Sequence, residues 1–359
     1  MKDIGLYIHV PFCKSRCPYC DFYTMRADEE TKAAYVEAVK RSLREWAAKE
    51  DFCASTVYFG GGTPSVLTGE QVAEILTVVK ELYHVPAAAE ITVECNPSSD
   101  LEHFIPVVAS AGVNRVSLGM QSAVDAERRQ LGRLSGTARV EECLDICRSA
   151  GIDNLSLDIM LGVPDQTMES LQSTLDFCVD TGVPHISSYM LKLEEGTNYW
   201  KRQDRLNLAD EDTVSAFYLE VGRRLAEAGF SHYEISNYAK PGYESRHNTK
   251  YWQCKEYLGI GPAAHSFLDG KRFYYERDLS SFLNGTEPVF DCTGGDFSER
   301  LMLALRLSEG FSEELPERIR QKLTRPYLAP YVTYDGTTLK LTEQGFLVSN
   351  AIIGLLLDD

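Results

Sequence analysis

The 359-residue sequence contains no run of about 18 consecutive apolar residues, the length that a helix needs to cross a bilayer. Its first residues, Met1–Ile4, lead directly into a strand-like segment, without the apolar core or cleavage site of a secretory signal peptide. The hydrophobic content of 44% is ordinary for a globular protein. We therefore expect a cytoplasmic protein without a membrane span.

Positive charge is scarce in this chain. Lysine and arginine number 36 against 53 aspartates and glutamates, which gives a net charge of −17. Because binding to a phosphate backbone needs a cationic surface, nucleic acid is not the expected partner. Internal repeats and low-complexity tracts are also lacking.

Strand-like apolar segments alternate with segments of helical periodicity, such as the one that carries Tyr35, Val39 and Leu43. Repeated βα units predict an α/β fold with a parallel sheet, and six units suit an incomplete (β/α)6 barrel better than an eight-fold one. Side chains that follow these strands are expected to meet in one site at the barrel mouth. The six predicted strands are Gly5–Val10, Thr56–Phe59, Glu90–Glu94, Arg115–Leu118, Asn154–Met160 and His185–Leu191.

Three regions are expected along the chain. Residues 1–195 form the partial barrel, and residues 196–295 form a helical and irregular extension that begins with a long helix, Asp212–Ala228. Residues 296–359 form a small C-terminal domain. Its helical run Arg300–Leu307, the hairpin turn Tyr334–Thr337 and the final helix Phe346–Leu357 predict a winged-helix-like order.

Three of the ten cysteines form a compact motif. Cys13, Cys17 and Cys20 follow the first strand with C-x3-C-x2-C spacing, whereas the others lie where buried core thiols are expected. Three converging thiolates can hold an iron–sulfur cluster and leave one iron open to a ligand. The alternative is a zinc site in which His9 or Asp21 supplies the fourth ligand.

A second motif, Phe59–Ser65, follows the second strand and contains three consecutive glycines. Glycine lets the backbone approach a ligand closely. The segment lacks the Walker lysine and the G-x-G-x-x-G spacing, so nucleotide phosphate binding is not favoured. Together with the cysteine motif one strand earlier, it favours the iron–sulfur interpretation over zinc.

The two motifs together resemble those of the radical SAM superfamily. The resemblance implies that Cys13, Cys17 and Cys20 hold a [4Fe-4S] cluster whose open iron binds S-adenosyl-L-methionine. In that family the glycine motif contacts the amino group of the cofactor, and an electron from the cluster cleaves the cofactor. An electron donor is therefore an implied partner.

Further segments resemble the coproporphyrinogen oxidase-like branch of the superfamily. They include Glu94–Pro97, Gly119–Ser122, Leu131–Arg133 and Asp158–Pro164, which follow successive strands. Where the branch often has histidine after Leu-Gly-Arg, this chain has Leu134. The resemblance implies a pocket for S-adenosyl-L-methionine lined by Tyr7, Tyr19, Gly61, Gly62, Thr63, Glu94, Gln121, Arg133 and Asp158.

Two functions occur in this branch, and the sequence favours one of them. The oxygen-independent coproporphyrinogen III oxidases have a fourth cysteine where this chain has Phe22, and they carry a long segment before the residue that corresponds to Tyr7. The chain is more similar to the heme chaperones of the HemW type, which bind heme and pass it to respiratory hemoproteins. The oxidase, or another radical SAM enzyme that acts on a tetrapyrrole, is the alternative.

The chaperones carry a His-Asn-x-x-Tyr-Trp motif, which this chain matches in full. The resemblance implies that heme and an apo-hemoprotein are partners, and that any membrane association passes through that target protein. Whether a histidine of the motif ligates the iron stays open, as does the role of His265 in the nearby Leu258–His265 segment. The heme motif comprises His247, Asn248, Tyr251 and Trp252.

Overall fold

The computed structural model describes residues 1–358. Its central feature is a run of six parallel strands that neighbour one another in chain order. All six predicted strands are present. Their bounds are β1 (Lys2–Val10), β2 (Phe52–Gly61), β3 (Glu90–Cys95), β4 (Arg115–Gln121), β5 (Asn154–Leu161) and β6 (His185–Met190).

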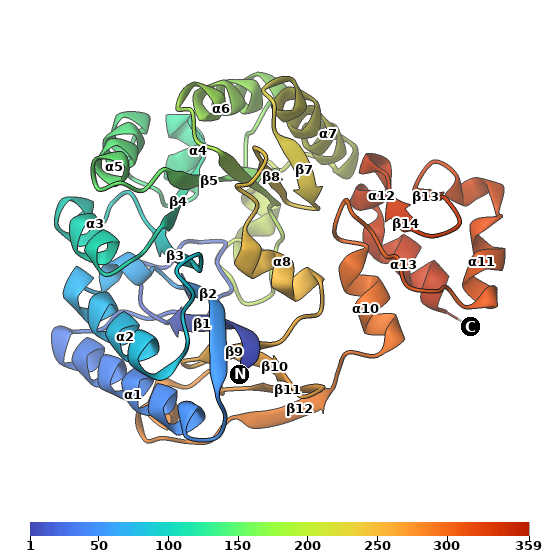
Figure 1. Ribbon diagram of the computed structural model, residues 1–359. Helices are drawn as coiled ribbons and strands as arrows, with labels where there is room; N and C mark the ends of the chain where they lie inside the picture. The colour runs from blue at the N-terminus through green and yellow to red at the C-terminus, as the bar shows by residue number, and fades with distance from the viewer. Residues whose placement is uncertain (359) are drawn as a thin grey trace.

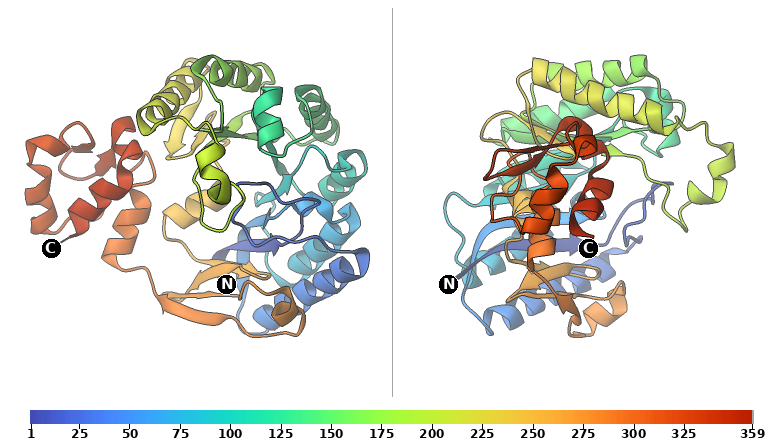
Figure 2. Two further views of the ribbon diagram at one scale, coloured as in Figure 1. Left: turned by 180° about the vertical axis from the view of Figure 1, so that it is seen from behind. Right: turned by 90° about the vertical axis from the view of Figure 1, so that its right-hand side faces the viewer.

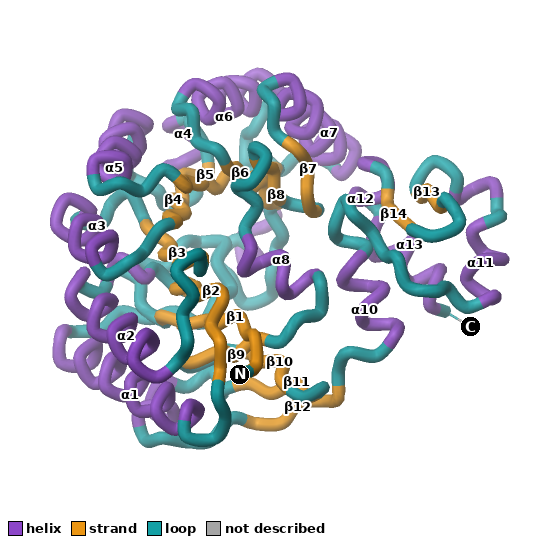
Figure 3. The backbone as a smooth tube through the Cα atoms, in the orientation of Figure 1, coloured by secondary structure: helices purple, strands orange, loops and turns teal. Residues whose placement is uncertain are grey.

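Helices cover the outer face of these strands and form an arc from α1 to α7 around one side of the sheet (Figures 1 and 3). Side-chain caps begin several of them: Asp28 accepts from Thr31 N–H, and Thr68 and Gln71 form a reciprocal capping box. The helices are α1 (Glu29–Ala47), α2 (Gly69–Leu82), α3 (Leu101–Ser110), α4 (Asp125–Gln130), α5 (Thr137–Ser149), α6 (Met168–Asp180) and α7 (Glu211–Glu227), with short 3-10 turns at Pro64–Val66 and Trp200–Arg205.

Alternation along the strands separates an apolar outer face from a polar inner face. In β5, Leu157 is fully buried against the helices, while its neighbour Asp158 faces the barrel interior beside Ser117 and Ser187. The strand register repeats this arrangement: Tyr7 lies opposite Tyr58, and Glu94 lies opposite Ser117. The inner face therefore offers polar groups to a ligand, and the outer face holds the core.

Short strands extend the sheet at both edges to a total of twelve among the described residues. The expectation of an irregular stretch before residue 295 was wrong here, because strands of three to five residues are too short to show alternation. One edge carries β9 (Tyr257–Ile260), parallel to β1, then β10 (His265–Leu268), β11 (Lys271–Tyr274) and β12 (Val289–Thr293). The other edge carries β8 (Asn237–Ala239) and β7 (Ser231–Glu234). In the chain, α8 (Arg246–Trp252) connects β8 to β9, and α9 (Leu279–Leu283) connects β11 to β12.

The C-terminal residues form a small unit beside the open side of the barrel, next to α7 (Figures 1 and 2). The predicted hairpin is present, whereas the predicted final helix is divided at Val348. Ile235 N–H donates to the Arg306 carbonyl (3.0 Å), which ties the unit to the β7–β8 turn. Its elements are α10 (Phe297–Ala304), α11 (Glu317–Leu323), a 3-10 turn at Pro326–Leu328, β13 (Val332–Tyr334), β14 (Leu339–Leu341), α12 (Glu343–Leu347) and α13 (Ser349–Leu357).

Among residues 1–358, no helix is both long enough and apolar enough to cross a bilayer. The three-region division of the chain and the winged-helix-like order stay predictions.

Candidate functional site

The three cysteines of the motif lie in the loop that joins β1 to α1, at the carboxyl end of β1. Their thiols are half-buried, and burial raises the pKa of Cys13 and of Cys20, with neighbouring Cys17 adding to both shifts. No three His, Cys, Asp or Glu side chains of residues 1–358 already form a metal cage. Protonated thiols do not attract one another. The positive charge of iron, when bound, would bring the three thiolates together.

The loop nevertheless supplies a donor set that suits a cluster with three protein ligands. The zinc alternative needs a fourth ligand, and His9 is not free to be one. Its Nδ1 lies 3.0 Å from the Tyr7 hydroxyl and its Nε2 lies 3.5 Å from the Tyr23 carbonyl. Asp21 is exposed and faces Arg277. The three thiols therefore fit an iron–sulfur cluster better than a four-ligand zinc site.

The glycine stretch after β2 packs directly against this cysteine loop. The N–H groups of Gly62 and Thr63 donate to the carbonyls of Val10 and Phe12, both at 2.8 Å. A Cβ on Gly62 would lie 2.7 Å from the Phe12 oxygen, and Gly61 has a φ of +108°. Glycine is required here because the two backbones touch. Thr63 Oγ1 also lies 3.4 Å from Cys13 Sγ.

Glu94 is the second-last residue of β3 and faces the interior of the barrel. The Tyr58 hydroxyl donates to its Oε1 at 2.8 Å, and Tyr7 lies beside Tyr58. Burial raises the pKa of Glu94 to about 7, and the nearby charge of Asp158 adds to the shift. The carboxyl group is therefore poised to bind a cationic or hydroxylic ligand while changing its protonation near neutral pH.

Asp158 lies two strands further along the same inner face. The Ser117 hydroxyl donates to its Oδ1 at 2.9 Å. Burial raises its pKa, whereas hydrogen bonds from Ser117 and Ser187 and the positive charge of Arg115 oppose the rise. Arg115 is almost completely buried, so it supplies fixed positive charge beneath the acidic groups.

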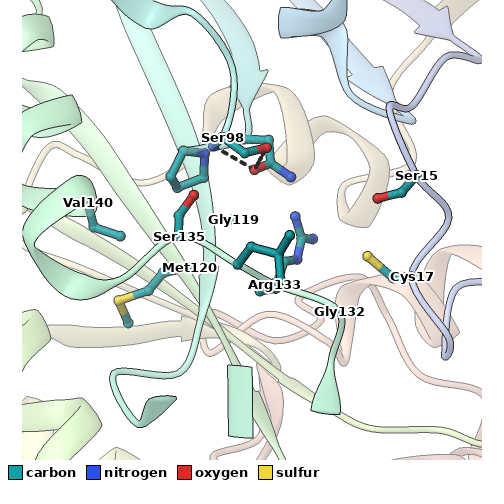
Figure 4. Close-up of a pocket in the computed structure, with 12 residues that line it drawn as sticks. Ser15, Cys17, Ser98, Gly119, Met120, Gly132, Arg133, Ser135 and Val140 are labelled. Atoms are coloured by element: carbon teal, nitrogen blue, oxygen red, sulfur yellow. Dashed lines mark hydrogen bonds between the residues drawn. The ribbon is translucent and has the colours of Figure 1, made fainter. Parts of the chain in front are cut away.

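Arg133 and Cys17 line a small cleft of about 70 Å³ beyond the ends of β3 and β4 (Figure 4). The Arg133 guanidinium donates to the Tyr19 hydroxyl at 3.3 Å, but its buried Nε has no partner among the described residues. Gln121 adopts a φ of 74° at the end of β4, and its side chain lies against Gly119 beside Arg133. An unpaired buried guanidinium N–H beside a thiol favours an anionic ligand in this cleft.

A second, larger cavity of about 720 Å³ lies between the cysteine loop, α8 and the strands β9 to β11. Tyr7, Gly61 and Glu94 from the predicted cofactor pocket line its inner wall. Tyr251 and Trp252 from the predicted heme motif line it as well. The structure therefore brings parts of the two predicted sites to one cavity.

His247 is buried and does not line that cavity. Its Nδ1 lies 2.8 Å from Thr56 Oγ1 and its Nε2 lies 2.7 Å from the Tyr251 hydroxyl. Burial lowers its pKa to about 3, and the ring stacks on Tyr58 at 5.1 Å. With both nitrogens occupied, His247 positions Tyr251 and leaves no lone pair for a metal ion.

The rest of the motif fastens α8 in place. The backbone N–H groups of Arg246 and His247 each donate to the Glu90 carboxylate at 2.9 Å. The Arg306 guanidinium lies 4.4 Å from the centre of the Trp252 ring, which links the helix to the C-terminal unit. Asn248 is half-buried beside them, with its N–H directed to the capping Ser245.

Sequence reasoning missed three residues that complete the inner face: Tyr58, Ser117 and Arg115. The two-residue period of the strands could have identified them, because it shows which residues share a face. Tyr58 precedes Gly60 by two positions, and Ser117 precedes Gly119 by two, so each shares a face with a motif residue.

We predict that Glu94 makes the stability of the ligand-free protein depend on pH. Between its ordinary pKa of about 4.5 and about 7, the folded chain holds a proton that the unfolded chain releases. The free energy of unfolding then falls as pH rises, by at most about 1.4 kcal/mol per pH unit. Denaturant titrations of wild type and Glu94→Gln from pH 4.5 to 8 should show a smaller decline in the variant. An equal decline in both would contradict the prediction, and the exposed Glu141→Gln serves as control.

We predict that His247→Ala destabilises the fold, because it leaves Thr56 and Tyr251 without their buried partner. The expected loss is about 2–4 kcal/mol of unfolding free energy, measured by denaturant midpoints. His103→Ala, on the exposed surface, should change stability by less than about 0.5 kcal/mol. Equal stability of the two variants would show that the hydrogen bonds of His247 contribute nothing.

Comparison with known proteins places these features in a family. The radical SAM superfamily model matches residues 7–178. The heme chaperone HemW of Mycobacterium tuberculosis (strain H37Rv) is 34% identical over 99% of this chain and 95% of its own length. The heme chaperone HemW of Escherichia coli (strain K12) is 32% identical over 99% of both chains.

The fold has a solved counterpart at lower identity. The structure of coproporphyrinogen III oxidase from Escherichia coli, a radical SAM enzyme, superposes with a TM-score of 0.85. It covers 99% of this chain and 90% of the oxidase at 18% identity, which shows a shared fold and confirms the predicted incomplete barrel. On the strength of the full-length relatives, this chain belongs to the radical SAM superfamily and, within it, to the HemW family.

Proposed function

We propose that this protein is a heme chaperone that binds heme and transfers it to apo-hemoproteins, and that it carries a [4Fe-4S] cluster and S-adenosyl-L-methionine. The full-length similarity to heme chaperones named HemW carries the proposal. Phe22, exposed at the position where the oxidases have a further cysteine, supports the chaperone over the oxidase.

Cys13, Cys17 and Cys20 would hold the cluster, since they are the three thiols of one loop that Gly62 and Thr63 fix by backbone hydrogen bonds. When bound, the cluster and its cofactor supply one-electron chemistry. Pro11 and Phe12 are buried and anchor the start of the loop in the core.

The pocket for S-adenosyl-L-methionine would extend along the ends of β1 to β5. Arg133, with a free buried Nε, would pair with the methionine carboxylate. Glu94 and Asp158 would accept hydrogen bonds from the ammonium or ribose hydroxyl groups, and Tyr19 would lie against the adenine. The backbone of the glycine stretch, with Thr63, would complete the pocket, and Tyr7 and Gln121 would close its ends.

We predict that Cys17→Ser abolishes the cluster, because two thiolates cannot hold it on this loop. Anaerobically reconstituted protein should lose its brown colour and its iron, to less than about a tenth of wild type. The exposed Cys292→Ser is the matched control and should retain both. Full iron content in Cys17→Ser, or stoichiometric zinc in wild type, would overturn the cluster assignment.

We predict that reconstituted wild-type protein binds heme saturably and delivers it to an apo-hemoprotein. Optical titration measures the binding, and the spectrum of the acceptor measures the transfer. A protein that neither binds nor transfers heme would refute the proposed function. Anaerobic decarboxylation of coproporphyrinogen III by the same preparation would favour the oxidase instead.

A further inference from the structure

The large cavity beside the cysteine loop contains two imidazoles, and their surroundings differ. His9 is buried beneath Gly61 with contacts at both ring nitrogens. His265 is exposed at the cavity wall, and neither of its ring nitrogens has a hydrogen-bond partner among residues 1–358. Together with the double occupation of His247, this leaves His265 as the imidazole of the cavity that is free to ligate a metal ion.

The backbone holds His265 firmly in this position. It begins β10 opposite Tyr274 of β11, and the two rings lie 5.3 Å apart at an angle of 30°. A Cβ on Gly259 would lie 2.2 Å from the His265 carbonyl, so glycine is needed at this position of β9, where the two backbones come close together. Although part of the residue is exposed, partial burial of the ring, together with the nearby charge of Arg272, lowers the pKa of His265 and favours the neutral ring.

The other walls of the cavity suit a flat, largely apolar ligand. Aromatic faces come from Tyr251, Trp252 and Tyr274. At the rim, the exposed Arg277 contacts the Asp21 carbonyl at 2.6 Å and lies 4.0 Å from the Asp21 carboxylate. The cavity volume of about 720 Å³ lies within the usual range of about 300–1,000 Å³ for small-ligand sites.

We propose that heme occupies this cavity with its iron bound to a ring nitrogen of His265 and a propionate paired with Arg277. This inference rests on the proposed heme-binding function and assigns its ligand. It gives His247 a positioning role, since that residue holds Tyr251 in the cavity wall. It also places heme against Phe22 of the cysteine loop and Glu94 of the cofactor pocket.

The test is a hemin titration of the anaerobically reconstituted full chain, followed by optical spectroscopy. His265→Ala should weaken binding at least about tenfold and shift the Soret band, and added imidazole should restore the wild-type spectrum. Arg277→Ala should weaken binding without shifting the band. His103→Ala, on the far surface of α3, should behave as wild type, and iron content and thermal midpoints verify that each variant is folded.

The outcomes separate this inference from the function on which it rests. If wild type binds heme and His265→Ala gives the same affinity and spectrum, the ligand assignment is wrong while the chaperone stands. If His247→Gln shifts the Soret band and His265→Ala does not, the iron is bound by the motif histidine. If wild type binds no heme, the proposed function itself fails.

Discussion

The candidate site depends on the contact between the ends of β1 and β2. Beyond the last strand pairs, Gly62 and Thr63 still donate hydrogen bonds to Val10 and Phe12. These bonds require glycine, because any side chain at Gly62 would meet the Phe12 carbonyl. The cysteine loop therefore starts from a fixed backbone, and residues of this loop line both the cleft of Arg133 and the larger cavity.

Buried charged groups inside the barrel lie close to both the cleft and the larger cavity. Arg115 lies buried among Glu90, Tyr58 and Asp158, and its positive charge lowers the cost of burying the carboxylates around it. Glu94 lies nearer the larger cavity, where burial keeps its pKa close to 7. A ligand that binds in either opening thus meets preorganised polar groups within an apolar shell.

In this structure the His-Asn-x-x-Tyr-Trp motif mainly holds α8 against the neighbouring elements. His247 joins α8 to β2, the Glu90 carboxylate joins it to β3, and Trp252 joins it to the C-terminal unit. Only Tyr251 and Trp252 face the cavity. The other two residues of the motif, His247 and Asn248, therefore support the wall of the cavity and do not line it.

The sequence by itself determined the six parallel strands, their polar ends and the cysteine loop. These features are local: strand alternation, glycine runs and cysteine spacing are properties of a few consecutive residues. Only the tertiary structure decided that short strands extend the sheet, because they are joined to it through β9, which pairs with the distant β1, and through β8, which pairs with β6. It also decided which histidine is free. The partner of His247, Thr56, lies 191 positions away in the chain, and nothing in the motif discloses that contact.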